Sequence, residues 1–262
     1  MNRKHLFEFE DQPWFPSSIR ACMQDHLTFM GNLSAPAYEA FVGKLKIAMD
    51  EVSQQEMVDL CSGAGGPMYT ILRLLRQQGL EARAQLTDLY PNLPAYRQRE
   101  HESGGTIRGV DYSVDATNVP VALAGFRLIA NGFHHFPPTA AVKILADAVA
   151  KGQGLAVIEM VNRSALAMFS VFVGLLGLLV CTPFFKPFRL SRLLWTYVLP
   201  IVPLCLVWDG IVSCLRVYSP RELHALVSQV EPNKYEWDIG ELPVGPGVVT
   251  YLIGIPARAT DR

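Results

Sequence analysis

The stretch M-V-D-L-C-S-G-A-G-G-P, residues 57–67, decides which fold this chain is expected to adopt. A short apolar run that carries one acid, Asp59, ends at Cys61 and is followed by three glycines in four positions. Apolar side chains then recur at helical spacing over residues 68–78. The pattern predicts a strand, a tight glycine turn and a helix N-terminus. Such a turn lets a ligand approach the backbone, and the helix N-terminus attracts polar or anionic groups.

The glycine turn does not match the dinucleotide-binding fingerprint. Gly63 and Gly65 fit the first two glycines of G-x-G-x-x-G, but Met68 stands at the third position. The turn alone is also compatible with an ordinary strand-to-helix junction that binds nothing. The segments that follow it decide between these two interpretations.

The composition limits the partners and the compartment. The chain has 262 residues and a formal net charge of −1, so it has no bulk attraction for nucleic acid. Half of the residues are hydrophobic and 18% are charged, which is apolar for a soluble enzyme. The five cysteines form no C-x-x-C pair, which favours buried thiols in a reducing compartment over disulfides or zinc. The N-terminal region contains acids and lacks the continuous apolar core of a signal peptide, so we expect a cytoplasmic location.

The chain divides into three predicted parts around one large core. Residues 1–52 are expected to form an N-terminal arm and helices, and the arm, residues 7–16, mixes aromatic, acidic and proline residues. Two alternatives stay open for this arm: it packs against the main domain, or it caps a substrate pocket. Residues 53–162 and 217–262 are predicted to form the core, with a hydrophobic helical hairpin, residues 163–216, inserted between them.

Polar side chains follow the predicted strands of the core. Apolar runs alternate with helical segments, which is typical of a mainly parallel sheet covered on both faces. The third of these strands is predicted over residues 108–114. The carboxyl ends of parallel strands meet at one edge of the sheet, where open α/β sheets bind ligands. The residues at or just after the predicted strand ends are Asp59, Asp88, Leu89, Asp115, Ala116, Asn131, His134, His135 and Glu159.

With these motifs in order, the chain resembles the class I S-adenosylmethionine-dependent methyltransferases over about residues 55–161 and 216–256. The resemblance implies an α/β, Rossmann-like sheet of seven mainly parallel strands in the order 3-2-1-4-5-7-6, with S-adenosyl-L-methionine as the cofactor. It also implies roles for the strand-end residues. Asp59, Gly63 and Gly65 would lie at the methionine end, Asp88 with Leu89 at the ribose, Asp115 with Ala116 near adenine, and Asn131 at the start of the segment that lines the transfer site.

His134 and His135 are the predicted catalytic residues. Methyl transfer from a sulfonium is a displacement in which alignment supplies much of the catalysis, and a base is needed only when the acceptor loses a proton. Histidine titrates near neutral pH, and this pair follows the fourth strand beside the expected transfer site. The alternative is that one or both histidines only pack or hydrogen-bond there. No third ligand stands at a recognisable spacing, so no metal site is predicted.

Residues 163–216 are unusually apolar. Two runs, 165–182 and 193–208, flank a connector that carries Lys186, Arg189 and Arg192. Each run falls short of the roughly 20 residues that span a membrane, and two spans would place these cations on the wrong side. An interfacial or re-entrant hairpin on the inner membrane face fits better. The alternative is a lid or a homodimer interface that closes over a hydrophobic acceptor.

The predicted function is S-adenosylmethionine-dependent methyl transfer to a hydrophobic small-molecule or lipid-like acceptor. One alternative is a protein with the methyltransferase fold that catalyses a different reaction. Another is a membrane-associated scaffold without catalysis. Asp209 lies next to Trp208 in an apolar context and needs a partner, for which Arg216 is the predicted residue.

Overall fold

The computed structural model describes residues 2–33, 35–185, 188–231, 234–245 and 247–257. Lys186 of the predicted cationic connector therefore lies outside the described residues.

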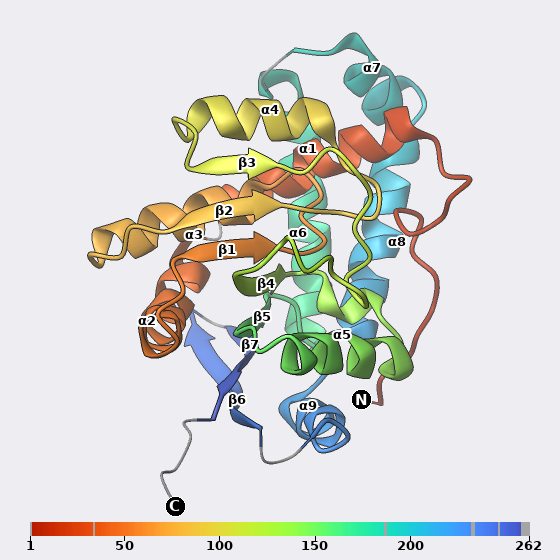
Figure 1. Ribbon diagram of the computed structural model, residues 1–262. Helices are drawn as coiled ribbons and strands as arrows, with labels where there is room; N and C mark the ends of the chain where they lie inside the picture. The colour runs from red at the N-terminus through yellow and green to blue at the C-terminus, as the bar shows by residue number, and fades with distance from the viewer. Residues whose placement is uncertain (1, 34, 186–187, 232–233, 246, 258–262) are drawn as a thin grey trace, which may run out of the picture.

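A seven-stranded sheet forms the centre of the structure, with the strand order β3-β2-β1-β4-β5-β7-β6 (Figure 1). The first five strands are parallel where they pair, whereas β7 runs antiparallel to both β5 and β6. The predicted fold class and strand order are confirmed. The strands are β1 Glu56–Asp59, β2 Arg83–Leu86, β3 Ile107–Gly109, β4 Phe126–Ala130, β5 Leu155–Glu159, β6 Tyr235–Val244 and β7 Gly247–Pro256.

Helices cover both faces of this sheet. One cluster of buried side chains joins the sheet to α2, α3 and α4, and includes Phe41, Ile71 and Tyr96. A second cluster joins the opposite face to α5 and α9 through Ile144 and Leu223. Apolar β strands buried on both faces account for the short, continuous hydrophobic runs in the sequence. These helices are α2 Ala35–Glu51, α3 Gly66–Gln77, α4 Leu93–Glu102, α5 Pro138–Ala150 and α9 Pro220–Val227.

A further group of helices lies outside the core. It comes from the N-terminal region and from the stretch of the chain between β5 and α9. Phe15 and Met23, from the N-terminal region, pack with Leu178 and Val202 in a third buried cluster. In Figure 1, α8 and part of α1 lie beyond the arrowheads of β1, β2 and β3. The elements of this group are α1 Ser17–Leu33, α6 Ala165–Cys181, the 3-10 helix η2 Thr182–Phe184, α7 Leu190–Leu193, the π-helical η3 Leu194–Val198 and α8 Ile201–Arg216.

The helices α6 and α8 approach each other closely at Gly210. A Cβ atom at this position would lie 2.9 Å from a methyl group of Val171, so only glycine permits the contact. The predicted hairpin of residues 163–216 is therefore helical and packed on itself. That it is an insertion relative to the methyltransferase family, and the division of the chain into three parts, stay predictions.

The third strand is shorter than predicted. β3 ends at Gly109, so the expected strand over residues 108–114 was wrong in its extent. The chain continues as a loop in which the Val110 N–H donates to Leu86 O at 2.9 Å and the Val114 N–H donates to Asp88 O at 3.0 Å. β3 is an edge strand, and residues 111–113 are exposed, so no apolar face holds the loop in the sheet.

The glycine turn after β1 gives a test of this local geometry. Gly63 and Gly65 both have left-handed backbones, with φ of 54° and 71°, but only at Gly65 would a Cβ atom collide, at 2.5 Å from Leu86 Cδ1. We expect Gly63→Ala to lower the free energy of unfolding by about 1 kcal/mol, from the left-handed backbone alone. Gly65→Ala should cost about 2–4 kcal/mol because the collision adds to it. Urea unfolding measures both, and equal losses would show that Leu86 moves aside freely.

Candidate functional site

The glycine turn leaves a helix N-terminus without a side-chain cap at the carboxyl edge of the sheet. Cys61, Gly63 and Gly65 all have positive φ, which turns the chain sharply between β1 and α3. No side chain caps α3, because its N-cap residue is Gly65. The first N–H groups of α3 and its positive dipole end therefore face the turn, where they favour an anionic group of a ligand.

Asp88 lies against this turn, as the sequence predicted from its position after β2. Its Oδ2 accepts a hydrogen bond from the Gly63 N–H at 3.0 Å, and its Oδ1 accepts one from the Tyr90 N–H at 2.9 Å. Burial raises the pKa of Asp88, and these two hydrogen bonds partly offset that rise. Leu89, the next residue, is 49% exposed.

The loop after β3 brings a second acid to the same edge. The hydrogen bond from Val114 to Asp88 ties this loop to the end of β2. Asp115 is exposed, and its Oδ1 accepts from the N–H and the hydroxyl of Thr117, both at 2.8 Å. Ala116 is buried beside it. Asp88 and Asp115 thus lie along one edge although they follow different strands.

Asp59 is the buried acid of the site. Its side chain ends β1 and is 2% exposed, and its pKa is raised to about 7. Burial is the largest cause, the charge of Asp88 adds to it, and a hydrogen bond from Ser62 offsets part of the rise. Two acids so close to one another favour a ligand that brings a positive charge to them.

The side chain of Asn131 makes its hydrogen bonds within the protein. It adopts a left-handed backbone with φ of 57°, its Oδ1 accepts from the Met160 N–H at 2.8 Å, and its Nδ2 donates to the Tyr38 hydroxyl at 3.1 Å. The following residue, Gly132, lies against Cys61 of the glycine turn. Asn131 therefore sets the direction of the chain beside the turn, and its predicted contact with a cofactor is not tested.

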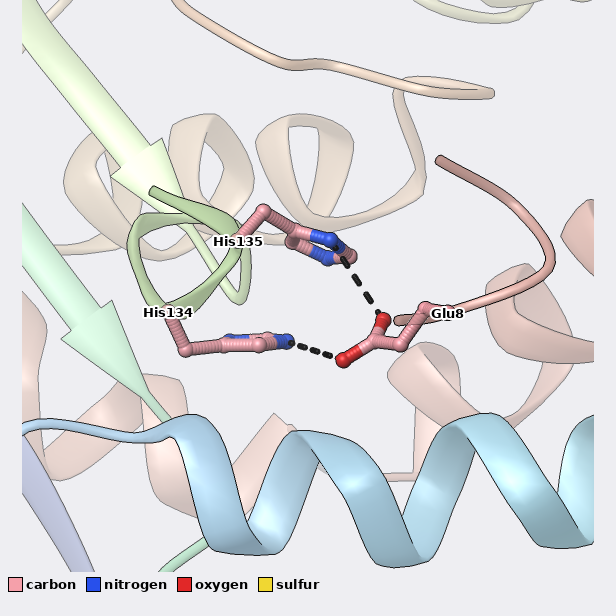
Figure 2. Close-up of side chains that lie close together, drawn as sticks. All are labelled: Glu8, His134 and His135. Atoms are coloured by element: carbon pink, nitrogen blue, oxygen red, sulfur yellow. Dashed lines mark ion pairs between the residues drawn. The ribbon is translucent and has the colours of Figure 1, made fainter. Parts of the chain in front are cut away.

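His134 is oriented by Glu159. It lies in the 3-10 helix η1, Phe133–His135, and Glu159 accepts from both its backbone N–H at 2.9 Å and its ring Nδ1 at 2.8 Å. A carboxylate only accepts, so the hydrogen is assigned to Nδ1 and the lone pair to Nε2. That Nε2 is buried, has no hydrogen-bond partner among the described residues, and lies 3.9 Å from Oε1 of Glu8 (Figure 2).

His135 is held as a cation. Its Nδ1 lies 2.7 Å from Asp11 Oδ1 and 3.4 Å from Glu8 Oε2. Burial opposes the charge, but the charge of Glu8 and the hydrogen bond to Asp11 outweigh it and raise the pKa of His135 to about 9. At neutral pH His135 is therefore protonated and cannot act as a base while the arm is in this position.

The N-terminal arm covers the histidine pair. Arg216, at the end of α8, joins the arm to this site through Glu8 at 3.1 Å and Asp11 at 2.7 Å. The predicted pair of Asp209 with Arg216 was wrong: Asp209 accepts instead from the backbone N–H groups of Phe9 and Glu10, at 2.8 and 3.2 Å. The sequence did not indicate Glu8 and Asp11 as site residues, although a cap over a substrate pocket is one of the two predictions for their segment.

Glu8, His134 and His135 also form a set that could hold a metal ion. Each offers one ligand atom, and these atoms lie within 4.8 Å of one another. Sequence spacing could not show this set because Glu8 comes from the arm. Arg216 already pairs with Glu8, so the carboxylate has a cation beside it.

Comparison with known proteins shows similarity in fold. No protein-family model and no curated protein matches the chain. The plantazolicin methyltransferase BpumL, solved in complex with SAH, is 11% identical, with a TM-score of 0.55 over 95% of this chain and 93% of that one. The mitomycin 7-O-methyltransferase MmcR is 18% identical, with a TM-score of 0.50 over 87% of this chain and 55% of that one.

A third solved structure, NcsB1 from neocarzinostatin biosynthesis, holds SAH and 1,4-dihydroxy-2-naphthoic acid. It is 17% identical, with a TM-score of 0.50 over 88% of this chain and 56% of that one. This chain thus spans a little over half the length of MmcR and NcsB1. The strand order and these similarities show that the chain has the fold of the class I S-adenosylmethionine-dependent methyltransferases.

The contact between the arm and His135 predicts a pH dependence of stability. The folded-state pKa of about 9 exceeds the ordinary value of 6.5, so the charged form stabilises the fold below pH 6.5. This contribution is lost as the pH rises toward 9. We expect the advantage of the wild type over His135→Gln in free energy of unfolding to fall by about 1–3 kcal/mol across this window.

Urea unfolding at several pH values measures this difference. His101→Gln, on the exposed end of α4, serves as the control and should show no such change. A pH-independent difference for His135→Gln would contradict the charged contact with Asp11 and Glu8.

Proposed function

We propose that this chain transfers a methyl group from S-adenosyl-L-methionine to a hydrophobic small molecule. The observation that carries the proposal is the open N-terminus of α3 beside Asp88, with His134 on the neighbouring strand end. The fold and the SAH bound in BpumL and NcsB1 support it. This chain's own residues are consistent with such a cofactor, because the N–H groups at the start of α3 lie at the same edge of the sheet as the carboxylates of Asp88 and Asp115.

In this proposal the N–H groups at the start of α3 bind the carboxylate of the cofactor, and Asp59 lies near its ammonium end. Asp88 accepts hydrogen bonds from the ribose hydroxyls, and Asp115 accepts one from the adenine amino group. Leu89 and Ala116 contribute apolar contact along the same edge. The cofactor supplies an electrophilic methyl group on a positively charged sulfur.

His134 is the proposed general base. Its Nε2 takes the proton from an acceptor hydroxyl, and Glu159 stabilises the imidazolium that forms. The acceptor oxygen then bonds to the methyl carbon as the carbon–sulfur bond breaks, leaving a neutral thioether. His135 lies next to the proposed base, and its charge depends on the position of the arm. Because Glu8 lies at Nε2, the acceptor reaches His134 only when the arm moves away.

A hydrophobic acceptor is favoured by the surroundings of the arm. Phe15, Met23 and Val202 are buried in the apolar cluster that joins the arm to α8, so movement of the arm would uncover apolar side chains. NcsB1 holds a dihydroxynaphthoic acid, an aromatic molecule with hydroxyl groups. We therefore include aromatic hydroxyl compounds among the acceptors to be screened. The mass of the product separates methyl transfer, which adds one CH2, from a different reaction on the same fold.

Cofactor binding is the first test. We expect S-adenosylmethionine to bind the purified protein with micromolar affinity in calorimetry. Asp88→Ala should weaken binding by about 10- to 100-fold, because two hydrogen bonds to a charged acceptor are lost. Asp50→Ala, on the surface of α2, is the matched control and should bind like the wild type. No binding to folded wild-type protein would reject the enzymatic proposal and favour the scaffold.

The base is tested separately from cofactor binding. We expect His134→Gln to lower kcat by about 10²- to 10⁴-fold for a hydroxyl acceptor found by screening, with cofactor affinity nearly unchanged. Glu159→Gln should lower kcat less, because the ring stays in place without its negatively charged partner. Initial rates across a pH series measure both effects. A His134→Gln variant with wild-type kcat would show that alignment alone supplies the catalysis.

A further inference from the structure

Helix α6 continues into η2 as one long apolar stretch that is mostly outside the core. Residues Ala165–Phe184 have a mean hydropathy of 2.4, and only 17% of the stretch is buried. Among the described residues it is the one straight helix long and apolar enough to cross a membrane. A buried core helix would explain the composition, but this helix is exposed. A signal sequence would stand near the N-terminus, and this helix does not.

Exposed apolar side chains recur through this region, and we name them together the apolar face. On α6 they recur three or four residues apart, so they share one side of the helix. Others lie on the elements that follow α6 in the chain, η2, α7, η3 and the start of α8. The members, each 47–77% exposed, are Phe169, Phe172, Val173, Leu176, Val180, Phe184, Leu190, Val198 and Leu204.

Polar groups within and beside the apolar face donate their hydrogen bonds to backbone carbonyl oxygens of the protein itself. The Ser170 hydroxyl donates to Ala167 O at 2.7 Å, and the Tyr197 hydroxyl donates to Leu179 O at 2.5 Å. The Trp208 indole N–H donates to the carbonyl oxygen of Phe7 at 2.9 Å. A hydrocarbon environment requires this arrangement, because it offers no partner to a polar group. A protein interface normally carries about one hydrogen bond across it per 100–200 Å².

The opposite side of the hairpin is fixed to the protein. Leu178 is 1% exposed in the cluster with α1, and Asp25 of α1 pairs with Arg192 and, at 3.6 Å, with Arg189. A helix that is packed along one side cannot cross a bilayer alone. Arg189 is 39% exposed in its side chain, and Trp208 is 39% exposed, and such residues are favoured at the headgroup level.

We propose that the apolar face docks on a lipid bilayer, with α6 lying along the membrane surface rather than across it. The aliphatic and phenyl groups enter the acyl region, and Arg189 meets anionic headgroups. This proposal does not depend on methyl transfer, since it concerns a surface away from the glycine turn.

Vesicle flotation tests the docking directly. The full chain is made by cell-free synthesis in the presence of vesicles, either phosphatidylcholine alone or mixed with phosphatidylglycerol. We expect it to float with both kinds and to stay bound in about 0.5 M NaCl, because apolar burial is not screened by salt. The double variant Phe169→Glu, Leu176→Glu should float at least about tenfold less. Val121→Glu, at an 80% exposed apolar position between β3 and β4, is the matched control and should float like the wild type.

Three results would overturn the proposal. In the first, the wild type stays unbound and monodisperse with both kinds of vesicle. In the second, it forms a dimer that the double variant dissociates, which would assign the apolar face to a second copy of the chain. In the third, binding occurs only with anionic vesicles and is lost in salt, which would reveal a purely electrostatic contact. Far-ultraviolet circular dichroism of each variant shows that the comparison is between folded proteins.

Discussion

A buried set of hydrogen bonds at the end of β1 holds the whole site in place. The Ser62 hydroxyl donates to the carbonyl of Asp59 at 2.8 Å, and the Thr87 N–H and hydroxyl donate to the same carbonyl, each at 2.9 Å. The Ser62 N–H in turn donates to Thr87 O. These bonds tie the ends of β1 and β2 together and offset the cost of a left-handed backbone at Cys61. The open helix end and Asp88 lie where they do because of this tie.

The carboxylates around the two histidines determine their hydrogen bonds. Glu8 and Asp11 keep a proton on His135, while Glu159 leaves the Nε2 lone pair of His134 free. Glu159 thus binds His134, Asp11 binds His135, and Glu8 lies near both rings. When the arm withdraws, His135 loses both acidic neighbours at once. Opening of the arm therefore changes the acid–base state of the site as well as the access to it.

Local patterns in the sequence were enough to predict the sheet and the meeting of Asp88 with the glycine turn, but not the contacts of the arm. The glycine turn and Asp88 follow from short-range rules, since a strand end, a turn and a helix start are adjacent in the chain. The sequence could not predict that β3 ends at Gly109, because β3 lies at the edge of the sheet and pairs with a strand on one side only. The contacts of Glu8 with His134 and Arg216 join segments far apart in sequence, and no spacing rule encodes them. Asp209 found backbone N–H groups rather than Arg216 for the same reason.

Composition alone left two interpretations of residues 163–216, a membrane hairpin or a lid, and the helix α8 has contacts that bear on both. The helix α8 carries Leu204 of the apolar face near its start and Arg216, which pairs with the arm, at its end. Between them Trp208 contacts the Phe7 ring and donates to its carbonyl oxygen. A surface that covers the apolar face and displaces Trp208 thus acts directly on the arm. Because the arm covers His134, the helix α8 connects the proposed bilayer contact with the access of an acceptor to the proposed base.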